Sequence, residues 1–314
     1  MIIKNIISKC KRIVKLLLFY PRYLLLKKSG EPDEIICFID GGLSSQMGQY
    51  SLGQEIQRIT GIQVSYDLTW FDKYGKDVSN KENRLYKLES VFPKIKVRRA
   101  SKEKILIYKR CFDVKKSLIQ NLDDIIISPP IFLGGYWYTK IYKNYKIENL
   151  RELYTFKLLL DSVNKQMLDK ILSEECTVAI HIRLGDYIGT IHDVTTPQYF
   201  YNAIEYIRKE IDSKNIHFFV FSNDINRCKN ILGSLPYIFS FVDINDNDHG
   251  EYDMYLMSNC HHFIISNSGV GYWPALLSDR SNKKIVIRPN KWFNKSYSEI
   301  ENVMPIPGWI KMEY

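Results

Sequence analysis

The sequence predicts an α/β protein whose sheets are parallel and doubly wound. Short runs of β-branched and apolar residues alternate along the chain with segments of helical character, as in successive strand–helix–strand units. The clearest run, residues 177–182, is nearly continuous in apolar character, as expected of a strand buried on both faces. A length of 314 residues favours two domains, and we place their boundary near Lys157.

Composition limits the class of protein and of partner. A hydrophobic share of 45% and a charged share of 25% argue against disorder, and the net charge of +9 favours an anionic partner without choosing one. The six cysteines lie far apart and form no C-x-x-C. This spacing predicts reduced thiols in a cytosolic protein, and neither a disulfide framework nor a zinc site. They are Cys10, Cys37, Cys111, Cys176, Cys228 and Cys260.

The first 30 residues form a segment of their own, in which lysines and arginines alternate with isoleucines and leucines. Its longest uncharged run is too short to span a bilayer, and it lacks the features of a signal peptide. A basic helix with an apolar face predicts an anchor that lies on an anionic membrane surface. The alternative is a helix folded back onto the body of the protein.

The first half of the chain begins like a nucleotide-binding fold. Residues 35–39 predict a buried strand, residues 40–45 a turn containing Gly41 and Gly42, and residues 46–59 a helix. Glycines in such a turn let backbone N–H groups approach an anion at the helix N-terminus. We also expect strands at 62–66, 106–112 and 125–128, a polar stretch at 67–104, and helices at 148–160 and 162–172.

The second half predicts the larger sheet. After the strand at 177–182, we expect a helix capped by Thr196 and Pro197 that extends to about residue 211. Further strands are expected at 217–221, 237–242, 262–266 and 285–287, with helices at 252–257 and from 269.

Three of these strands end in polar residues, and the carboxyl edge of an open α/β sheet is where ligands bind. The three ends are Arg183-Leu-Gly-Asp186, Ser222-Asn-Asp224 and Ser266-Asn-Ser268, which together predict a single cleft. His181 and Arg183 point to the same side of their strand, since side chains alternate with period two. The alternative is that Arg183 and Asp186 neutralise each other as a surface pair.

Several motifs carry a resemblance to a known family. They are Gly41-Gly-Leu-Ser-Ser-Gln-Met-Gly-Gln-Tyr50, Gly135-Tyr-Trp137, His181-Ile-Arg-Leu-Gly-Asp-Tyr187, Thr196-Pro-x-Tyr199, Phe221-Ser-Asn-Asp224, Asp253-Met-Tyr-Leu-Met-Ser258, Ser266-Asn-Ser268 with Trp273, and the C-terminal Pro289, Trp292 and Pro307-Gly-Trp309. In this order and spacing the chain resembles glycosyltransferase family 11, the α-1,2-fucosyltransferases that use GDP-fucose.

The resemblance implies a GT-B architecture, two Rossmann-like domains with a cleft between them. Residues 31–157 would be the acceptor side and residues 158–314 the GDP-sugar side, preceded by the segment 1–30. It implies an inverting, metal-independent transfer of fucose to the 2-hydroxyl of a galactose-type acceptor, an oligosaccharide or lipid-linked glycan of a surface polysaccharide. No cofactor is needed besides the donor GDP-fucose, and no nucleic acid is a partner. The place of action would be the cytoplasmic face of the membrane.

The residues carried over by the resemblance form one candidate site. His181, Arg183 and Asp186 are the catalytic candidates. The donor-binding candidates are Gly41, Gly42, Gln46, Arg183, Ser222, Asp224, Asp253, Ser266, Asn267 and Ser268. Arg183 suits a diphosphate because a guanidinium forms paired charge-assisted hydrogen bonds, and a helix N-terminus after Ser268 favours phosphate. His181 is expected as a brace or hydroxyl partner in preference to a base.

The chain also departs from the family pattern. Leu184 replaces a second arginine, Ser44-Ser45 replaces Gly-Asn, Gly48 replaces phenylalanine, Asn223 replaces an acidic residue, and Gly271-Tyr272 alters a Trp-rich patch. These changes leave GDP-colitose or another GDP-deoxysugar as an alternative donor. A non-catalytic nucleotide or anion binder is the alternative function.

Other motifs are assigned no chemistry. Asp246-Asn-Asp248 matches the metal-binding D-x-D of other glycosyltransferases, but it lies in a polar run that predicts a solvated loop, so no metal is expected. His192 either reaches substrate or faces solvent. The scattered basic residues, with no stacking motif, argue against nucleic-acid binding.

Overall fold

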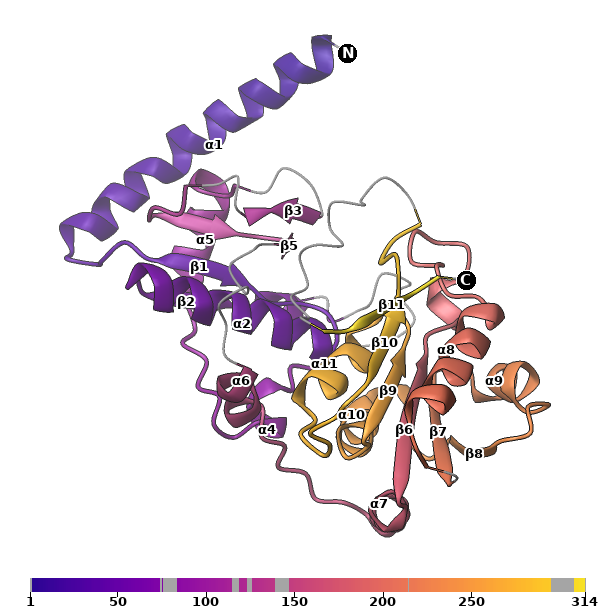
Figure 1. Ribbon diagram of the computed structural model, residues 1–314. Coiled ribbons are helices and arrows are strands. Elements are labelled where there is room, and N and C mark those ends of the chain that lie inside the picture. Colours follow the sequence, from indigo (N-terminus) through magenta and orange to yellow (C-terminus); the bar gives the residue numbers. More distant parts are fainter. Residues whose placement is uncertain are drawn as a thin grey trace. The chain divides into compact units, whose positions relative to one another are not determined.

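The computed structural model describes residues 2–73, 75, 84–114, 119–122, 126–138, 147–213, 215–294 and 308–313. The chain forms two compact units (Figure 1). Unit 1 comprises Met1–Tyr86 and Lys96–Tyr142, and unit 2 comprises Lys87–Ile95 and Lys143–Tyr314.

Unit 1 is built on a three-stranded parallel sheet in the order β2-β1-β4. The predicted opening is confirmed, since strand β1 leads through the Gly41-Gly42 turn into helix α2 and then to β2. A two-stranded parallel ribbon pairs β3 with β5. The elements are α1 (Ile2–Lys28), β1 (Ile35–Phe38), α2 (Leu43–Thr60), β2 (Val64–Asp67), α3 (Thr69–Lys73), α5 (Lys102–Cys111), β3 (Ile119–Asn121), β4 (Ile131–Leu133) and β5 (Tyr136–Tyr138).

The strand predicted at 106–112 is wrong, because residues 106–111 belong to helix α5 and Phe112 is its C-cap. The side chain of Ser101 caps that helix by accepting a hydrogen bond from the backbone N–H of Lys104. A short apolar run has no period that separates a buried strand from a buried helix turn. The strand predicted at 125–128 is also absent from its described part, residues 126–128, and β4 begins after Pro130.

Unit 2 contains a six-stranded sheet, all parallel, in the order β11-β10-β9-β6-β7-β8. These pairings confirm the predicted α/β class with parallel sheets. The edge strand β11 was not predicted. The elements are α4 (Leu88–Val91), α6 (Ile147–Leu153), α7 (Ser162–Ser173), β6 (Cys176–Ile182), η3 (Gly185–Tyr187), α8 (Pro197–Glu210), β7 (Ile216–Ser222), α9 (Ile225–Leu232), β8 (Ile238–Val242), η4 (Asn247–His249), α10 (Gly250–Ser258), β9 (His262–Ile265), α11 (Gly269–Leu277), β10 (Val286–Pro289) and β11 (Ile310–Met312).

Strand β6 lies in the interior of this sheet between β7 and β9 (Figure 1), and all seven of its residues are buried. Helix α8 packs on it through Tyr199, Phe200, Ala203, Ile204 and Ile207, a spacing that keeps one helical face apolar. The predicted cap is present, since Thr196 Oγ accepts a hydrogen bond from the backbone N–H of Tyr199. The buried strand therefore fixes the position of the residues that follow it.

The unit boundary lies earlier than the one predicted near Lys157. Arg151 of α6 donates hydrogen bonds from Nε to the carbonyl oxygen of Leu277 and from Nη2 to that of Ser278, both at 3.1 Å. The ring of Phe92 lies 5.0 Å from that of Tyr154. These contacts attach α6 and the segment Lys87–Ile95 to unit 2.

Helix α1 is part of unit 1, where Tyr23 is buried in a cluster with Ile36, Ile107, Tyr108 and Phe132. Within the described residues, no helix is both long and apolar enough to cross a membrane. The cysteines Cys37, Cys111, Cys176, Cys228 and Cys260 are free thiols.

Candidate active site

Three polar strand ends meet at the carboxyl edge of the sheet in unit 2. Strands β9, β6 and β7 are neighbours and run parallel, so residues 266–268, 183–186 and 222–224 follow adjacent strands at the same edge. Ser266 links two of them, because its Oγ lies 3.0 Å from His181 Nδ1 and accepts a hydrogen bond of 3.1 Å from the backbone N–H of Arg183. The structure thus joins residues that the sequence predicted to share an edge.

His181 is buried, with 3% of its surface exposed, and acts as a brace between strands. Ser266 Oγ accepts from the backbone N–H of Arg183 and is also within hydrogen-bond distance of His181 Nδ1, where the tautomer of the ring decides which group donates. Burial first, and the nearby charge of Arg183 second, lower the pKa of His181 to about 3. A Cβ built on Gly271 would lie 2.9 Å from His181 Nδ1, so helix α11 approaches the ring closely only because residue 271 is glycine.

Arg183 is clamped by its neighbours in the loop after β6. Its Nε donates to Asp186 Oδ1 at 2.8 Å and its Nη2 to Asp186 Oδ2 at 3.0 Å. The guanidinium also lies over the ring of Tyr187, 5.7 Å from the centroid. The side chain of Arg183 is 19% exposed and that of Asp186 is 43% exposed. A guanidinium carries five N–H donors, so the edge formed by Nη1 and Nη2 retains donors beyond those directed at Asp186.

Asn223 holds this loop in place from the end of β7. Its Oδ1 accepts a 2.9 Å hydrogen bond from the backbone N–H of Leu184, and its Nδ2 lies 3.4 Å from Asp186 Oδ1. Gly185 has φ +47°, and a Cβ there would meet Asn223 Nδ2 at 2.6 Å. Leu184 itself is 8% exposed and packs in the core, so the side chain at the position of the family's second arginine turns away from the loop surface.

Asn267 and Ser268 lie at the start of helix α11 and are both buried. Ser268 caps the helix by accepting from the N–H of Val270, and Asn267 Nδ2 donates to the carbonyl oxygens of His192 at 3.0 Å and Trp292 at 2.8 Å. Among the described residues, nothing partners the buried Oδ1 of Asn267. Asn267 therefore fastens two loops to the sheet edge and still has an acceptor to offer.

The loop histidine His192 does not face solvent freely. Its ring stacks on Tyr187 at 4.8 Å and lies 5.2 Å from Phe293. Its Nδ1 is buried, without a hydrogen-bond partner in the described part of the chain, and burial lowers the pKa of the ring. The sequence left its position open and gave no signal for this stack.

The other predicted residues of unit 2 lie in separate local networks. Asp224 caps helix α9 by accepting from the N–H of Arg227 at 3.1 Å, and Ser222 Oγ accepts from the N–H of Asp224 at 3.0 Å. Asp253, on α10, accepts from Asn245 Nδ2 at 2.8 Å, and burial raises its pKa to about 7. No contact within the described residues joins these side chains to Arg183.

The predicted residues of unit 1 form one turn. Gly41 has φ +73°, a conformation that favours glycine, and Gly42 precedes the first residue of α2. Gln46 is fully buried, and its Nε2 donates to the carbonyl oxygens of Gly41 at 3.0 Å and Leu85 at 2.9 Å. Gln46 thus closes the turn from inside.

The D-x-D sequence lies in an exposed turn. Asp246 accepts from the N–H of Asp248 and pairs with His249 Nδ1 at 2.7 Å. Lys87 pairs with Glu251 at 2.7 Å beside it. In the described part of the chain, no three His, Cys, Asp or Glu side chains gather closely enough to hold a metal ion.

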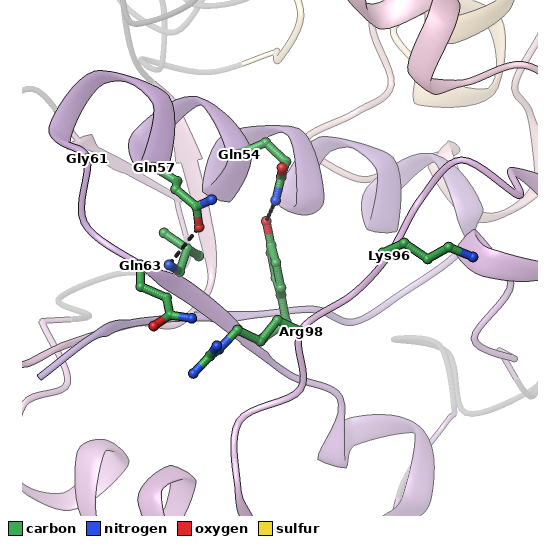
Figure 2. Close-up of a pocket in the computed structure, with 8 residues that line it drawn as sticks. Gln54, Gln57, Gly61, Gln63, Lys96 and Arg98 are labelled. Carbon is green, nitrogen blue, oxygen red and sulfur yellow. Dashed lines mark hydrogen bonds between the residues drawn. The ribbon is translucent and has the colours of Figure 1, made fainter. Parts of the chain in front are cut away.

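Unit 1 also has a polar pocket away from its predicted site residues. It lies at the amino end of β2, whereas the Gly41-Gly42 turn follows the carboxyl end of β1. Figure 2 shows Gln54 donating to the hydroxyl of Tyr66, and Gln57 accepting from the backbone of Val64. Arg98 and Lys96 complete the lining but come from an extended segment without assigned chemistry.

Comparison with known proteins gives a consistent result. The family model described as glycosyl transferase family 11 matches residues 91–313. An alpha-1,2-colitosyltransferase of Escherichia coli is 29% identical over 300 residues, covering 89% of this chain and 99% of the relative. The O-antigen biosynthesis glycosyltransferase WbnK of Escherichia coli is 26% identical over 296 residues, covering 82% and 95%.

Among solved structures, the fucosyltransferase NodZ from Bradyrhizobium is 12% identical, with a TM-score of 0.49 over 78% of this chain and 93% of that one. The family assignment does not depend on this likeness. It follows from the family model, which spans the whole sheet of unit 2 and the loop of Arg183. This protein is a glycosyltransferase and belongs to glycosyl transferase family 11.

Proposed function

We propose that this enzyme moves L-fucose from GDP-fucose to the 2-hydroxyl of a galactose-type sugar, with inversion and without a metal ion. The observation that carries the proposal is the position of Arg183, fixed by a buried strand beside the capped N-terminus of α11. The acceptor would be an oligosaccharide or lipid-linked glycan of a surface polysaccharide.

The diphosphate of the donor fits the chemistry of this edge. The Nη1–Nη2 edge of Arg183 can form paired charge-assisted hydrogen bonds to phosphate oxygens while Asp186 holds the other edge. The N-terminus of α11 offers backbone N–H groups and the positive end of a helix dipole. His181 adds no charge near neutral pH, because burial lowers the pKa of its ring to about 3.

In the proposed reaction, the charge that needs stabilisation develops on the leaving group. The acceptor hydroxyl oxygen forms a bond to C1 of the sugar and releases its proton to solvent, the bond from C1 to the phosphate oxygen breaks, and the diphosphate gains negative charge. Donors already fixed around that charge stabilise the transition state more than the ground state. Arg183, held by Asp186, which Asn223 contacts in turn, is such a donor.

A second donor, GDP-colitose, is favoured by one observation, the 29% identity to an alpha-1,2-colitosyltransferase. Colitose is fucose without its 3-hydroxyl, so a comparison of the two donors tests whether the site contacts that hydroxyl. A site that hydrogen-bonds a substrate hydroxyl rejects the analogue lacking it by roughly 10⁴-fold or more. An apolar site tolerates the added hydroxyl far better.

The test uses the purified full chain with GDP-fucose, GDP-colitose, GDP-mannose and UDP-galactose. We expect hydrolysis of one of the first two donors, and transfer to a galactoside that NMR identifies as a 1,2 linkage of inverted configuration. Hydrolysis of UDP-galactose alone would contradict the proposal. Tight GDP binding with no turnover of any donor would assign the chain to the non-catalytic binders instead.

A further inference from the structure

Helix α1 has two apolar faces, and one of them is buried on unit 1. Tyr23, 9% exposed, packs edge-on against Phe112 at 4.8 Å, and its hydroxyl donates to Asp33 at 3.0 Å. Leu26 joins the same cluster, where α1 lies against α5. The helix is therefore docked on its unit.

The link that follows α1 is fastened as well. Lys104 of α5 forms ion pairs with Glu31 at 2.8 Å and with the buried Glu34 at 3.1 Å. Lys27, near the end of α1, pairs with Asp33 at 3.0 Å. Because both its last turns and its link are held, the orientation of α1 on unit 1 is set by the fold.

The opposite face of α1 is apolar and exposed. Six large apolar side chains have 46–71% of their surface exposed, and their spacing of three, four or seven residues aligns them along one side of the helix. With 3.6 residues per turn, this side is opposite Tyr23 and Leu26. The exposed stripe consists of Ile13, Val14, Leu17, Leu18, Leu24 and Leu25.

Cations border the stripe. Lys15 and Arg22, seven residues apart and both exposed, lie along one of its edges, and Lys28 closes its C-terminal end. The whole chain carries a net charge of +9. Apolar side chains flanked by lysine and arginine are the pattern of helices that lie in the interface of an anionic membrane.

We propose that α1 is a fixed docking helix, which binds the surface of an anionic lipid bilayer through the exposed stripe while its other face holds unit 1. Figure 1 shows α1 crossing unit 1 beside α5 and continuing beyond it toward the N-terminus. A second copy of the chain fits this face less well, because an antiparallel pairing of two stripes brings Lys15 of one copy close to Arg22 of the other.

The proposal is independent of the donor chemistry in unit 2, and it changes how the segment has to be tested. Removal of residues 1–30 takes away Tyr23 and Leu26 and uncovers Ile107, Tyr108 and Phe112. Truncation would therefore unfold or destabilise unit 1 whether or not the helix binds lipid. Substitutions on the exposed stripe avoid that problem.

The experiment is sedimentation of the full chain with phosphatidylcholine vesicles, with and without phosphatidylglycerol. We expect salt-sensitive binding to the anionic vesicles, weakened at least tenfold in the double variant Leu17→Gln/Leu25→Gln. The matched control is Ile126→Gln/Leu159→Gln, which removes side chains that are 89% and 94% exposed elsewhere. The control should bind like the wild type, and both variants should keep the wild-type melting temperature.

A charge variant separates the two parts of the interaction. Lys15→Gln/Arg22→Gln should weaken binding to anionic vesicles by about fivefold per cation and leave binding to neutral vesicles unchanged. Equal binding of wild type and Leu17→Gln/Leu25→Gln would overturn the proposal. So would a dimer in light scattering that this variant dissociates, with no vesicle binding by the wild type. Donor hydrolysis in solution should stay unchanged in every variant, which keeps this test separate from that of the transferase.

Discussion

Replacement of Arg183 by alanine distinguishes two accounts of the same side chain. In the first, the guanidinium contacts the donor diphosphate. In the second, Arg183 and Asp186 only neutralise each other, since the structure shows them paired at 2.8 and 3.0 Å. The accounts differ in what is lost, ligand affinity or protein stability.

The expected magnitudes follow from the exposure of the pair. A hydrogen bond to a charged group contributes about 1.5–3 kcal/mol, so loss of one phosphate contact should weaken GDP binding by roughly tenfold to 150-fold. Turnover should fall further, because the contact strengthens as charge develops on the leaving group. The ion pair itself contributes little to stability, about 0.2–1 kcal/mol, since Asp186 is 43% exposed and screened by water.

Two further variants complete the experiment. Arg183→Lys should recover only part of the activity, because an ammonium cannot bind Asp186 through two parallel hydrogen bonds and also present a second edge. Arg208→Ala is the matched control. Arg208 also pairs with a carboxylate three residues away, Glu205 at 3.6 Å, and lies 4.4 Å over the ring of Tyr237. It should behave like the wild type in GDP binding and turnover.

The assays are calorimetric titration of GDP and steady-state turnover of the donor, with urea unfolding as the measure of stability. Equal GDP affinity and normal turnover in Arg183→Ala, together with a small loss of stability, would refute the first account. That outcome would remove Arg183 from the site and leave the surface pair as its role.

Three other predictions concern the surroundings of this loop. Gly271→Ala should destabilise the protein by about 1–3 kcal/mol in urea unfolding, since its Cβ would lie 2.9 Å from the His181 ring. The control Gly48→Ala should cause no loss of stability, because the space around its new Cβ is open. The pKa of His181 falls from 6.5 to about 3 on folding, so between those two pH values only the unfolded chain takes up this proton. The free energy of unfolding should therefore fall as pH drops through that window, by up to about 1.4 kcal/mol per pH unit. In His181→Gln this part of the pH dependence should vanish, and an unchanged slope would count against the buried neutral ring. Turnover should persist in excess EDTA, and a loss restored by manganese or magnesium would assign a metal to Asp246 and Asp248.

The sequence predicted the parts of the fold that depend on local pattern. The buried strand β6 and the capped start of α8 at Thr196 are examples, because continuous apolar character and cap chemistry are local signals. Helix α5 was mistaken for a strand since its short apolar run fits either structure. The edge strand β11 has only three residues, and its half-exposed pattern gives no signal apart from its pairing with β10.

The sequence likewise predicts some contacts of the candidate site and misses others. That Arg183, Asn223 and Ser266 share an edge could be predicted, because parallel strands place their ends together. The brace of Asn267 could not, since it bonds to residues 75 and 25 positions away in the chain. Nor could the close approach of Gly271 to His181, which exists only once α11 packs on β6.

The loss of the family's second arginine also has a structural consequence. Leu184 is buried, and it supports the loop through its backbone, whose N–H donates to Asn223 Oδ1 and whose carbonyl oxygen accepts from the N–H of Tyr187. The loop after β6 therefore has one cationic side chain, Arg183, which also pairs with Asp186. A diphosphate that binds here adds negative charge beside the Asp186 carboxylate, and the two repel each other. Asn223 Nδ2 reduces this repulsion because it points a hydrogen-bond donor at Asp186 Oδ1. An acidic side chain at position 223 would add a second negative charge at the same place. Because Leu184 leaves the loop with a single arginine, a neutral amide at position 223 suits a diphosphate site here better than a carboxylate does.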